Sequence, residues 1–217
     1  MPIFPKKAEF PANSLPQGIP LLHGAALDPP WARRRFRLAF LRGEPIIEAS
    51  ITERAMPDDT SPAGDPESAK VIALVSSILA VDLARYDLAE AAFAPEVVID
   101  YTSLWGGEPQ RTTPGALMDA WRGLVPGFDA TRHELRDVEA KVEGDRATAT
   151  AFVDGRHWIG GALWRPIGTY RRRLSRIDGR WKVTAMTFAM THEVGDRGLV
   201  VIAAERARRR AAAARAD

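Results

Sequence analysis

The chain has 217 residues, of which 46% are hydrophobic and 27% charged, a composition typical of one globular domain with an extension. It contains no cysteine, which excludes disulfides, thiolate zinc sites and a cysteine nucleophile. The net charge of +2 is too small to indicate nucleic acid binding, and no apolar run reaches the about 18 residues of a membrane span. With no secretory hydrophobic region at its N-terminus, the chain is expected to be cytoplasmic, with no nucleic acid or membrane partner.

Residues 1–65 are predicted to be an N-terminal extension. They are rich in proline and lack sustained apolar periodicity, and the stretch MPDDTSPAGDP is typical of a linker. We expect an arm that packs on the domain of residues 66–217 or on a neighbouring subunit.

A carboxylate interrupts the first predicted helix of this domain. Asp65 is placed to cap the helix, and Pro66 fits its first position. The apolar residues that follow at helical spacing are Val71, Leu74, Val75, Ile78 and Leu79. Asp82 is the next member of this stripe, and Tyr86 follows four residues later. Because a buried, unpaired carboxylate is strongly destabilising, Asp82 must either reach solvent or have a partner.

A short helix at residues 87–94, before Pro95, and a strand at residues 96–105 come next. The side chains of Val97, Ile99 and Tyr101 share one side of this strand. Thr113 then begins another helix, with Leu117, Trp121 and Leu124 on one face.

The second half of the domain is predicted to be mostly strand. The alternating patterns cover residues 131–142, 147–158, 167–177 and 180–192, and residues 198–210 form a final helix. The pair Asp178-Gly179 is a strong hairpin signal between the last two strands. This order predicts an α+β fold with helices on one face of a curved antiparallel sheet.

Histidine supplies the natural partner for Asp82. Thr131, His133 and Leu135 share one face of a strand, so His133 is expected to point inward, and His157 lies on the next strand. An inward carboxylate beside an inward histidine would form an acid–base dyad with no nucleophile of its own. A core histidine with satisfied hydrogen bonds is the alternative reading of the same pattern.

Several of these features together resemble the SnoaL-like branch of the nuclear-transport-factor-2-like superfamily, to which scytalone dehydratase belongs. The resemblance covers roughly residues 68–196, outside the extension. It is carried by the acid in the first helix, by FAPEVVIDYTS, by TRH at a strand start and by RIDGRWKV in the late hairpin. It implies a cone-shaped fold in which the helices and the curved sheet enclose a pocket.

The resemblance also implies roles for single residues. Asp82 would orient His133 as the base, Tyr101 would hold a substrate carbonyl or a water, and His157 would be the second histidine of the site. Family members often have a tyrosine just before the helical acid, where this chain has Val81. Catalytic relatives commonly associate through the sheet, and the alternating alanines of ATATAF suggest a flat face for a homodimer or homotrimer.

The expected function is that of a cofactor-independent lyase or isomerase, with dehydration leading, that acts on a small hydrophobic, oxygenated substrate. No metal site is expected, since no His, Asp and Glu cluster has a suitable spacing. A polyketide cyclase or ketosteroid isomerase type of enzyme, and a non-catalytic ligand-binding or assembly module, are the alternatives. The residues expected to contact the substrate are Tyr86, Trp121, Trp158, Phe188 and Met186.

Overall fold

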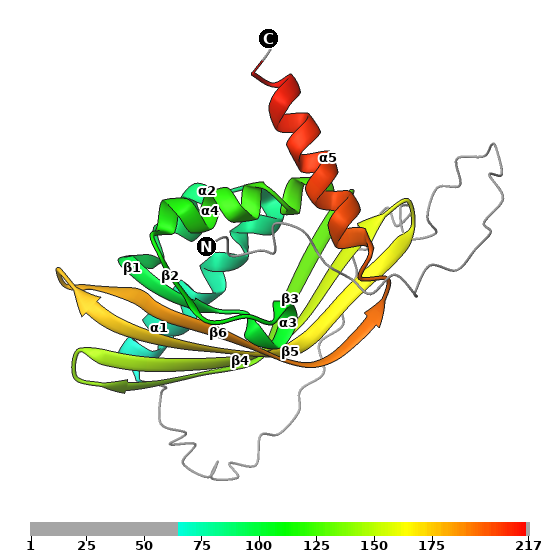
Figure 1. Ribbon diagram of the computed structural model, residues 1–217. Coiled ribbons are helices and arrows are strands. Elements are labelled where there is room, and N and C mark those ends of the chain that lie inside the picture. The colour runs from blue at the N-terminus through cyan, green and yellow to red at the C-terminus, as the bar shows by residue number, and fades with distance from the viewer. Residues whose placement is uncertain (1–64, 216–217) are drawn as a thin grey trace, which may run out of the picture. The chain divides into compact units, whose positions relative to one another are not determined.

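The computed structural model describes residues 65–215, and the predicted extension, apart from Asp65, lies outside the described residues. Within this range the expected α+β fold is confirmed, because helices cover the concave face of one curved sheet (Figure 1). None of the helices in this range combines the length and the apolar character needed to cross a membrane. The helical elements are α1 (Pro66–Ser77), η1 (Ile78–Leu83), α2 (Tyr86–Glu90), α3 (Thr102–Trp105), α4 (Pro114–Arg122), η2 (Val125–Gly127) and α5 (Leu199–Ala213).

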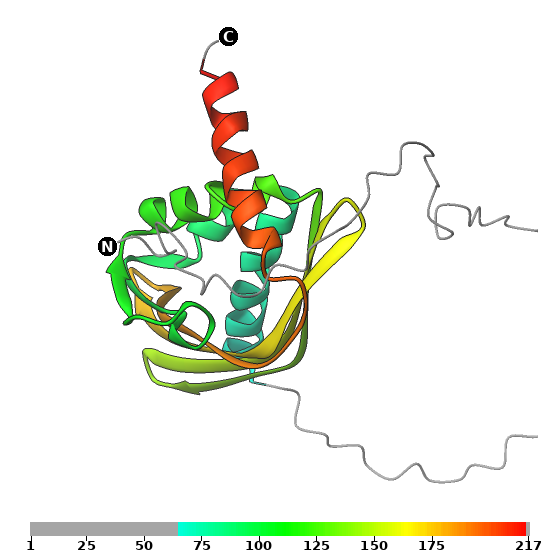
Figure 2. The ribbon, with the colours of Figure 1, turned by 45° about the vertical axis from the view of Figure 1, so that its right-hand side comes forward.

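The sheet has six strands in the order β2-β1-β6-β5-β4-β3. All neighbours are antiparallel except β1 and β6, which run parallel. In the view of Figure 2, α1 crosses the hollow of the curved sheet. The strands are β1 (Phe93–Asp100), β2 (Gln110–Thr112), β3 (Ala130–Glu143), β4 (Arg146–Ile159), β5 (Ala162–Ile177) and β6 (Arg180–Gly195).

Side-chain caps and a tight turn fix the ends of these elements as the sequence predicts. The Asp65 carboxylate accepts hydrogen bonds from the Glu67 and Ser68 amides, both at 3.2 Å, and so caps α1. Asp178 and Gly179 have φ angles of 48° and 74° in the turn between β5 and β6. Two consecutive positive φ angles match the twist of a two-residue hairpin, which explains the Asp-Gly pair.

The predicted strand at residues 96–105 has different bounds in the structure. The strand ends at Asp100, whose carboxylate accepts hydrogen bonds from the Thr102 amide at 3.0 Å and the Thr102 hydroxyl at 2.7 Å. This local turn starts α3, so Tyr101 lies at a strand–helix junction. At the other end, the helix expected up to residue 94 stops at Glu90, and Pro95 falls where the pairing of β1 with β6 is irregular. Proline has no N–H to donate to a neighbouring strand, so it is tolerated at an irregular position where regular pairing is interrupted.

Small side chains let α1 lie close to the sheet. Ala147 and Ala149 of β4 are buried in one cluster with Val71 and Val75 of α1, both of which are 0% exposed. These alanines therefore face the core. The prediction that the alanines of ATATAF form an exposed flat face is wrong. A homodimer or homotrimer stays a prediction.

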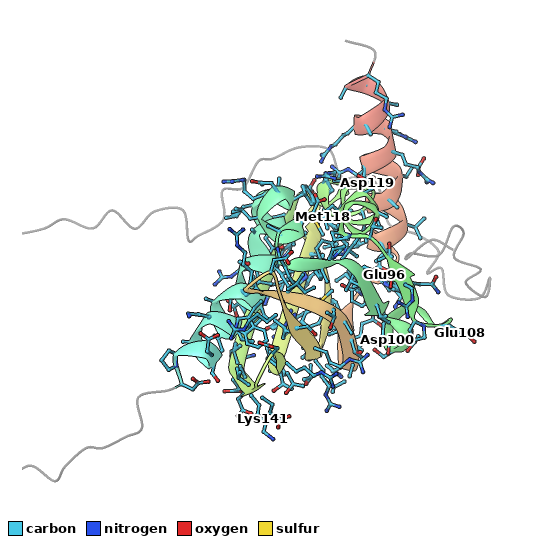
Figure 3. All side chains as sticks on the ribbon, turned by 90° about the vertical axis from the view of Figure 1, so that its left-hand side faces the viewer. Glu96, Asp100, Glu108, Met118, Asp119 and Lys141 are labelled. Atoms are coloured by element: carbon cyan, nitrogen blue, oxygen red, sulfur yellow. The ribbon has the colours of Figure 1, made fainter. Side chains whose placement is uncertain are left out.

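Helix α4 shows the same division between a buried and an exposed side. Met118 is fully buried, whereas its neighbour Asp119 is exposed. Figure 3 shows Asp119 at one end of the domain and Lys141, near the tip of the β3–β4 hairpin, at the other. The apolar core and the site described below lie between these charged ends.

Helix α5 docks on the domain through one very close backbone contact. Its buried residues Leu199, Ala203 and Ala207 are spaced four apart, and Ala203 packs over Gly127 at the end of η2. A Cβ atom at Gly127 would lie 1.7 Å from the Ala203 carbonyl oxygen, so only glycine allows this approach. An ion pair of 2.8 Å between Arg206 and Asp129 supports the same contact.

We expect Gly127→Ala to destabilise the domain by about 1–3 kcal/mol, since the backbone of α5 must move to admit a methyl group. Gly115→Ala is the matched control, because its added Cβ meets nothing closer than 3.7 Å and alanine favours the helix. Urea unfolding of both variants measures the difference. Equal stability of Gly127→Ala and the wild type would contradict the close packing of α5.

Candidate active site

Asp82 owes its position to a change in helix geometry. The α-helix α1 ends at Ser77 and continues as the 3₁₀ helix η1, which ends where Ala84 adopts a left-handed conformation with a φ of 57°. In a 3₁₀ helix, residues i and i+3 lie on one line, so Val81 follows Ile78 into the core. Asp82 therefore lies outside the apolar stripe, and its side chain points toward strand β3.

The Asp82 carboxylate accepts three hydrogen bonds from the start of β3. The Thr131 hydroxyl donates to Oδ1 at 2.7 Å, the His133 amide donates to Oδ2 at 2.6 Å, and the His133 ring Nδ1 lies 2.8 Å from Oδ1. The expected contact between Asp82 and His133 is therefore present. The two side chains are only 13% and 17% exposed, respectively.

The electrostatics of this contact favour an ionised carboxylate. Burial pushes the pKa of Asp82 upward, but the hydrogen bond and charge of His133, with the Thr131 hydroxyl and the His133 amide, outweigh it. The net result is a pKa below the ordinary value of 3.8. An ionised Asp82 holds the ring proton on Nδ1 of His133, which leaves Nε2 of the neutral ring as a proton acceptor.

A glycine keeps this acceptor open. Gly155 of β4 pairs with His133 across the sheet. A Cβ atom at Gly155 would lie 3.0 Å from Cδ2 and 3.2 Å from Nε2 of His133. Any other residue would therefore crowd the Nε2 edge of the ring.

His157 lies beside His133 and is held neutral. The two rings meet edge to face with 5.0 Å between their centroids, and His157 also packs on Phe128 and Trp164. Burial, and after it the charge of His133, lower the pKa of His157 to about 3. Its buried Nδ1 has no hydrogen-bond partner within residues 65–215. The hydrogen-bonding capacity of this nitrogen is therefore unused within the described residues.

The rings face a cavity between the helices and the concave sheet face. Of the residues expected at the site, His133, His157, Tyr101, Trp121, Met186 and Phe188 line this cavity, and Asp82 lies behind His133.

Tyr86 and Trp158 do not line it, contrary to their expected contact with the substrate. Trp158 follows His157 on β4 and so points to the opposite face of the sheet. Tyr86 starts α2 after the left-handed turn at Ala84, and the Arg122 guanidinium covers its ring at 4.8 Å.

Further cavity residues come from strand β5, which contributes none of the expected substrate contacts. Trp164, Tyr170 and Arg172 all face the cavity. The Tyr101 side chain interacts with Tyr170 and Trp121, and burial raises the pKa of both tyrosines. The alternation of side chains along β5 could have identified two of these residues from the sequence, because it places residues 170 and 172 on one face. Within the described range, no group of three or more His, Asp or Glu side chains is arranged to hold a metal ion.

Three solved structures with similar folds are 16%, 17% and 23% identical to this chain. A protein from Kribbella flavida, Kfla4162, has a TM-score of 0.55 at 23% identity, over 64% of this chain and 95% of that one. A proposed scytalone dehydratase from Novosphingobium aromaticivorans has a TM-score of 0.51 at 16% identity, over 59% and 87%. A hexachlorocyclohexane dehydrochlorinase, LinA-type3 from Novosphingobium barchaimii, has a TM-score of 0.51 at 17% identity, over 60% and 90%.

None of the curated proteins matches the chain. The model of the SnoaL-like domain matches residues 71–187, more than half of the chain and nearly all of the cavity wall. This match fits the curved sheet, the helices over its concave face and the fold of the similar structures. The chain belongs to the SnoaL-like domain family.

Proposed function

We propose that the protein is a cofactor-independent lyase, with dehydration as its leading reaction, in which His133 is the base. The observation that carries the proposal is the hydrogen-bonded pair of Asp82 and His133 at the wall of a largely apolar cavity. Two of the similar structures are described as a proposed dehydratase and a dehydrochlorinase, and both names denote elimination reactions. These likenesses support a lyase in general, and the residue roles rest on the site geometry.

The reaction is an elimination next to an electron-withdrawing group. Nε2 of His133 takes a proton from the carbon beside a carbonyl, and the electrons of that C–H bond form the new C=C bond. The adjacent C–O bond breaks, and the departing hydroxide receives the proton that His133 gained. Water leaves, the ring is neutral again, and no external oxidant or reductant is consumed.

The neighbouring groups suit this step. The Asp82 carboxylate stabilises the His133 cation that forms after proton transfer. His157 remains uncharged near neutral pH, so it does not repel that cation and can hydrogen-bond the substrate oxygen. Tyr101, whose pKa is raised mainly by burial, stays protonated and can donate to a carbonyl or to the leaving oxygen.

A non-catalytic ligand-binding module is the second candidate. The observation that favours it is Val81, an apolar, buried residue where family members often carry a tyrosine. The two candidates differ in the effect of removing the charge of Asp82.

Asp82→Asn is expected to lower the turnover of a β-hydroxy carbonyl substrate by about 10²–10⁴-fold, the usual contribution of a positioned base. The amide keeps the shape of the side chain but no longer stabilises the His133 cation. A panel of such compounds is first tested with the wild type, and dehydration is followed by the absorbance of the conjugated product.

Asp87→Asn is the control for this experiment, because Asp87 is exposed and its carboxylate pairs with the exposed Arg85, away from the cavity. It should retain wild-type turnover. If Asp82→Asn retains it as well, the acid is structural and the lyase mechanism is wrong.

The neutral state of His157 predicts a pH dependence of folding stability. Its pKa falls from 6.5 to about 3 on folding, so between these values the unfolded chain binds a proton at this site and the folded chain does not. Stability must therefore decrease as the pH falls from 6.5, by at most about 1.4 kcal/mol per pH unit from this residue.

His157→Phe keeps an aromatic ring and removes the titration. Urea unfolding from pH 8 to pH 4 should give a flatter profile for this variant than for the wild type. The difference at pH 8, where His157 is neutral in both states, measures the change in packing alone. Parallel profiles would contradict the buried neutral histidine.

A further inference from the structure

One buried cation in the cavity has no anionic partner. Arg172 lies on β5, lines the cavity and is only 1% exposed. Its Nε and Nη1 atoms have no hydrogen-bond partner anywhere in the described range. A guanidinium is always charged in proteins and carries five N–H donors, so unmet donors of this kind are strongly unfavourable in a buried site.

Within the described residues, the Arg172 guanidinium interacts with the side chains of two tyrosines. Its guanidinium lies 4.4 Å from the centroid of the Tyr170 ring. Its interactions with ionisable groups are limited to Tyr170 and Tyr101, and no carboxylate of residues 65–215 pairs with it. The ring face attracts the cation but accepts no conventional hydrogen bond from Nε or Nη1.

Among the described residues, Asp154 is the one carboxylate buried to the same degree, and it shows how a buried charge is otherwise paired. It is 0% exposed, on β4, and accepts hydrogen bonds of 2.6–2.7 Å from Arg156 and Arg165. Each of its oxygens is therefore paired with a guanidinium. Arg172 is buried to the same degree without such a partner, and it faces a space that a ligand can enter.

We propose that Arg172 forms an anion-binding subsite that selects substrates carrying a carboxylate. A carboxylate matches the planar guanidinium fork, and a single cation balances its single charge, whereas a phosphate dianion would need more donors. The aromatic walls from Trp105, Trp164 and Phe188 favour a flat, apolar body between the carboxylate and the reacting carbon.

The subsite lies away from the proposed base. His133 pairs with Gly155 on β4, and Arg172 pairs with Ala149, six residues earlier on the same strand. Arg172 therefore holds the substrate by a group that does not react, and it sets specificity without taking part in proton transfer. The inference rests on the proposed function to the extent that it takes this cavity as the substrate site.

Binding of matched pairs of probes tests the subsite without a known substrate. Benzoate with benzamide, and 2-naphthoate with 2-naphthamide, differ in charge but little in shape. Isothermal titration should show that the wild type binds the carboxylate of at least one pair about tenfold or more tightly than its amide, the effect of one charge-assisted contact. If neither carboxylate is preferred, the proposal is overturned, whatever the variants do.

Arg172→Met removes the charge and keeps the length of the side chain. It should abolish the preference for the carboxylate, while the unfolding midpoint without ligand stays equal or rises, because an unpaired buried charge is replaced by an apolar chain. Arg172→Lys keeps the charge and serves as a second variant. If both Arg172→Met and Arg172→Lys still prefer the carboxylate, Arg172 has a packing role and the proposal is wrong.

Arg165→Met is the matched control on the same strand. It leaves Asp154 with a single guanidinium partner, so it should lower the unfolding midpoint and leave the carboxylate preference unchanged. Asp82→Asn separates the two proposals. It removes the charge that stabilises the His133 cation, but the variant protein should still bind the carboxylate more tightly than the amide. Failure of the lyase mechanism would thus show in turnover alone, and failure of the anion subsite in binding alone.

Discussion

The Asp82 carboxylate ties the helical layer to the edge of the sheet, and the geometry of the site depends on it. It accepts one hydrogen bond from a hydroxyl, one from a main-chain amide and one from a ring, all from the first residues of β3. The three donors fix both oxygens, so neither the rotation of the carboxylate nor the orientation of the His133 ring is free. These hydrogen bonds offset the unfavourable free energy of burying the Asp82 charge, and they orient the His133 ring so that Nε2 faces the cavity.

Charged side chains are paired differently on the two faces of the sheet. On β4, alternation sends Asp154 to one face, where two arginines neutralise it, and Gly155 and His157 to the other. Among the described residues that line the cavity, Arg172 is the only arginine and no carboxylate is present, while the Asp82 carboxylate behind His133 is already engaged by that ring. A pocket with this imbalance is complementary to a molecule that brings its own negative charge.

Features with a local cause could be predicted from the sequence. The caps at Asp65 and Thr113 and the Asp178-Gly179 turn depend on a few adjacent residues, and the strand period predicted that His133 points inward. The change from α-helix to 3₁₀ helix at Ile78 depends on packing against the sheet, and no local signal marks it. Arg172 was missed for a related reason, because it sits between two other arginines in a run that is typical of exposed charge.

The parallel pairing of β1 with β6 has a consequence for how the chain reaches its native state. The strands β3 to β6 are joined in sequence by short turns and can form from neighbouring hairpins. Strand β1, in contrast, has only the three residues of β2 as a local partner, and residues 101–179 separate it from β6. During synthesis, Val97 and Ile99 therefore lack their main partner strand until β6 has emerged from the ribosome, so the sheet can be completed only after most of the domain has been made.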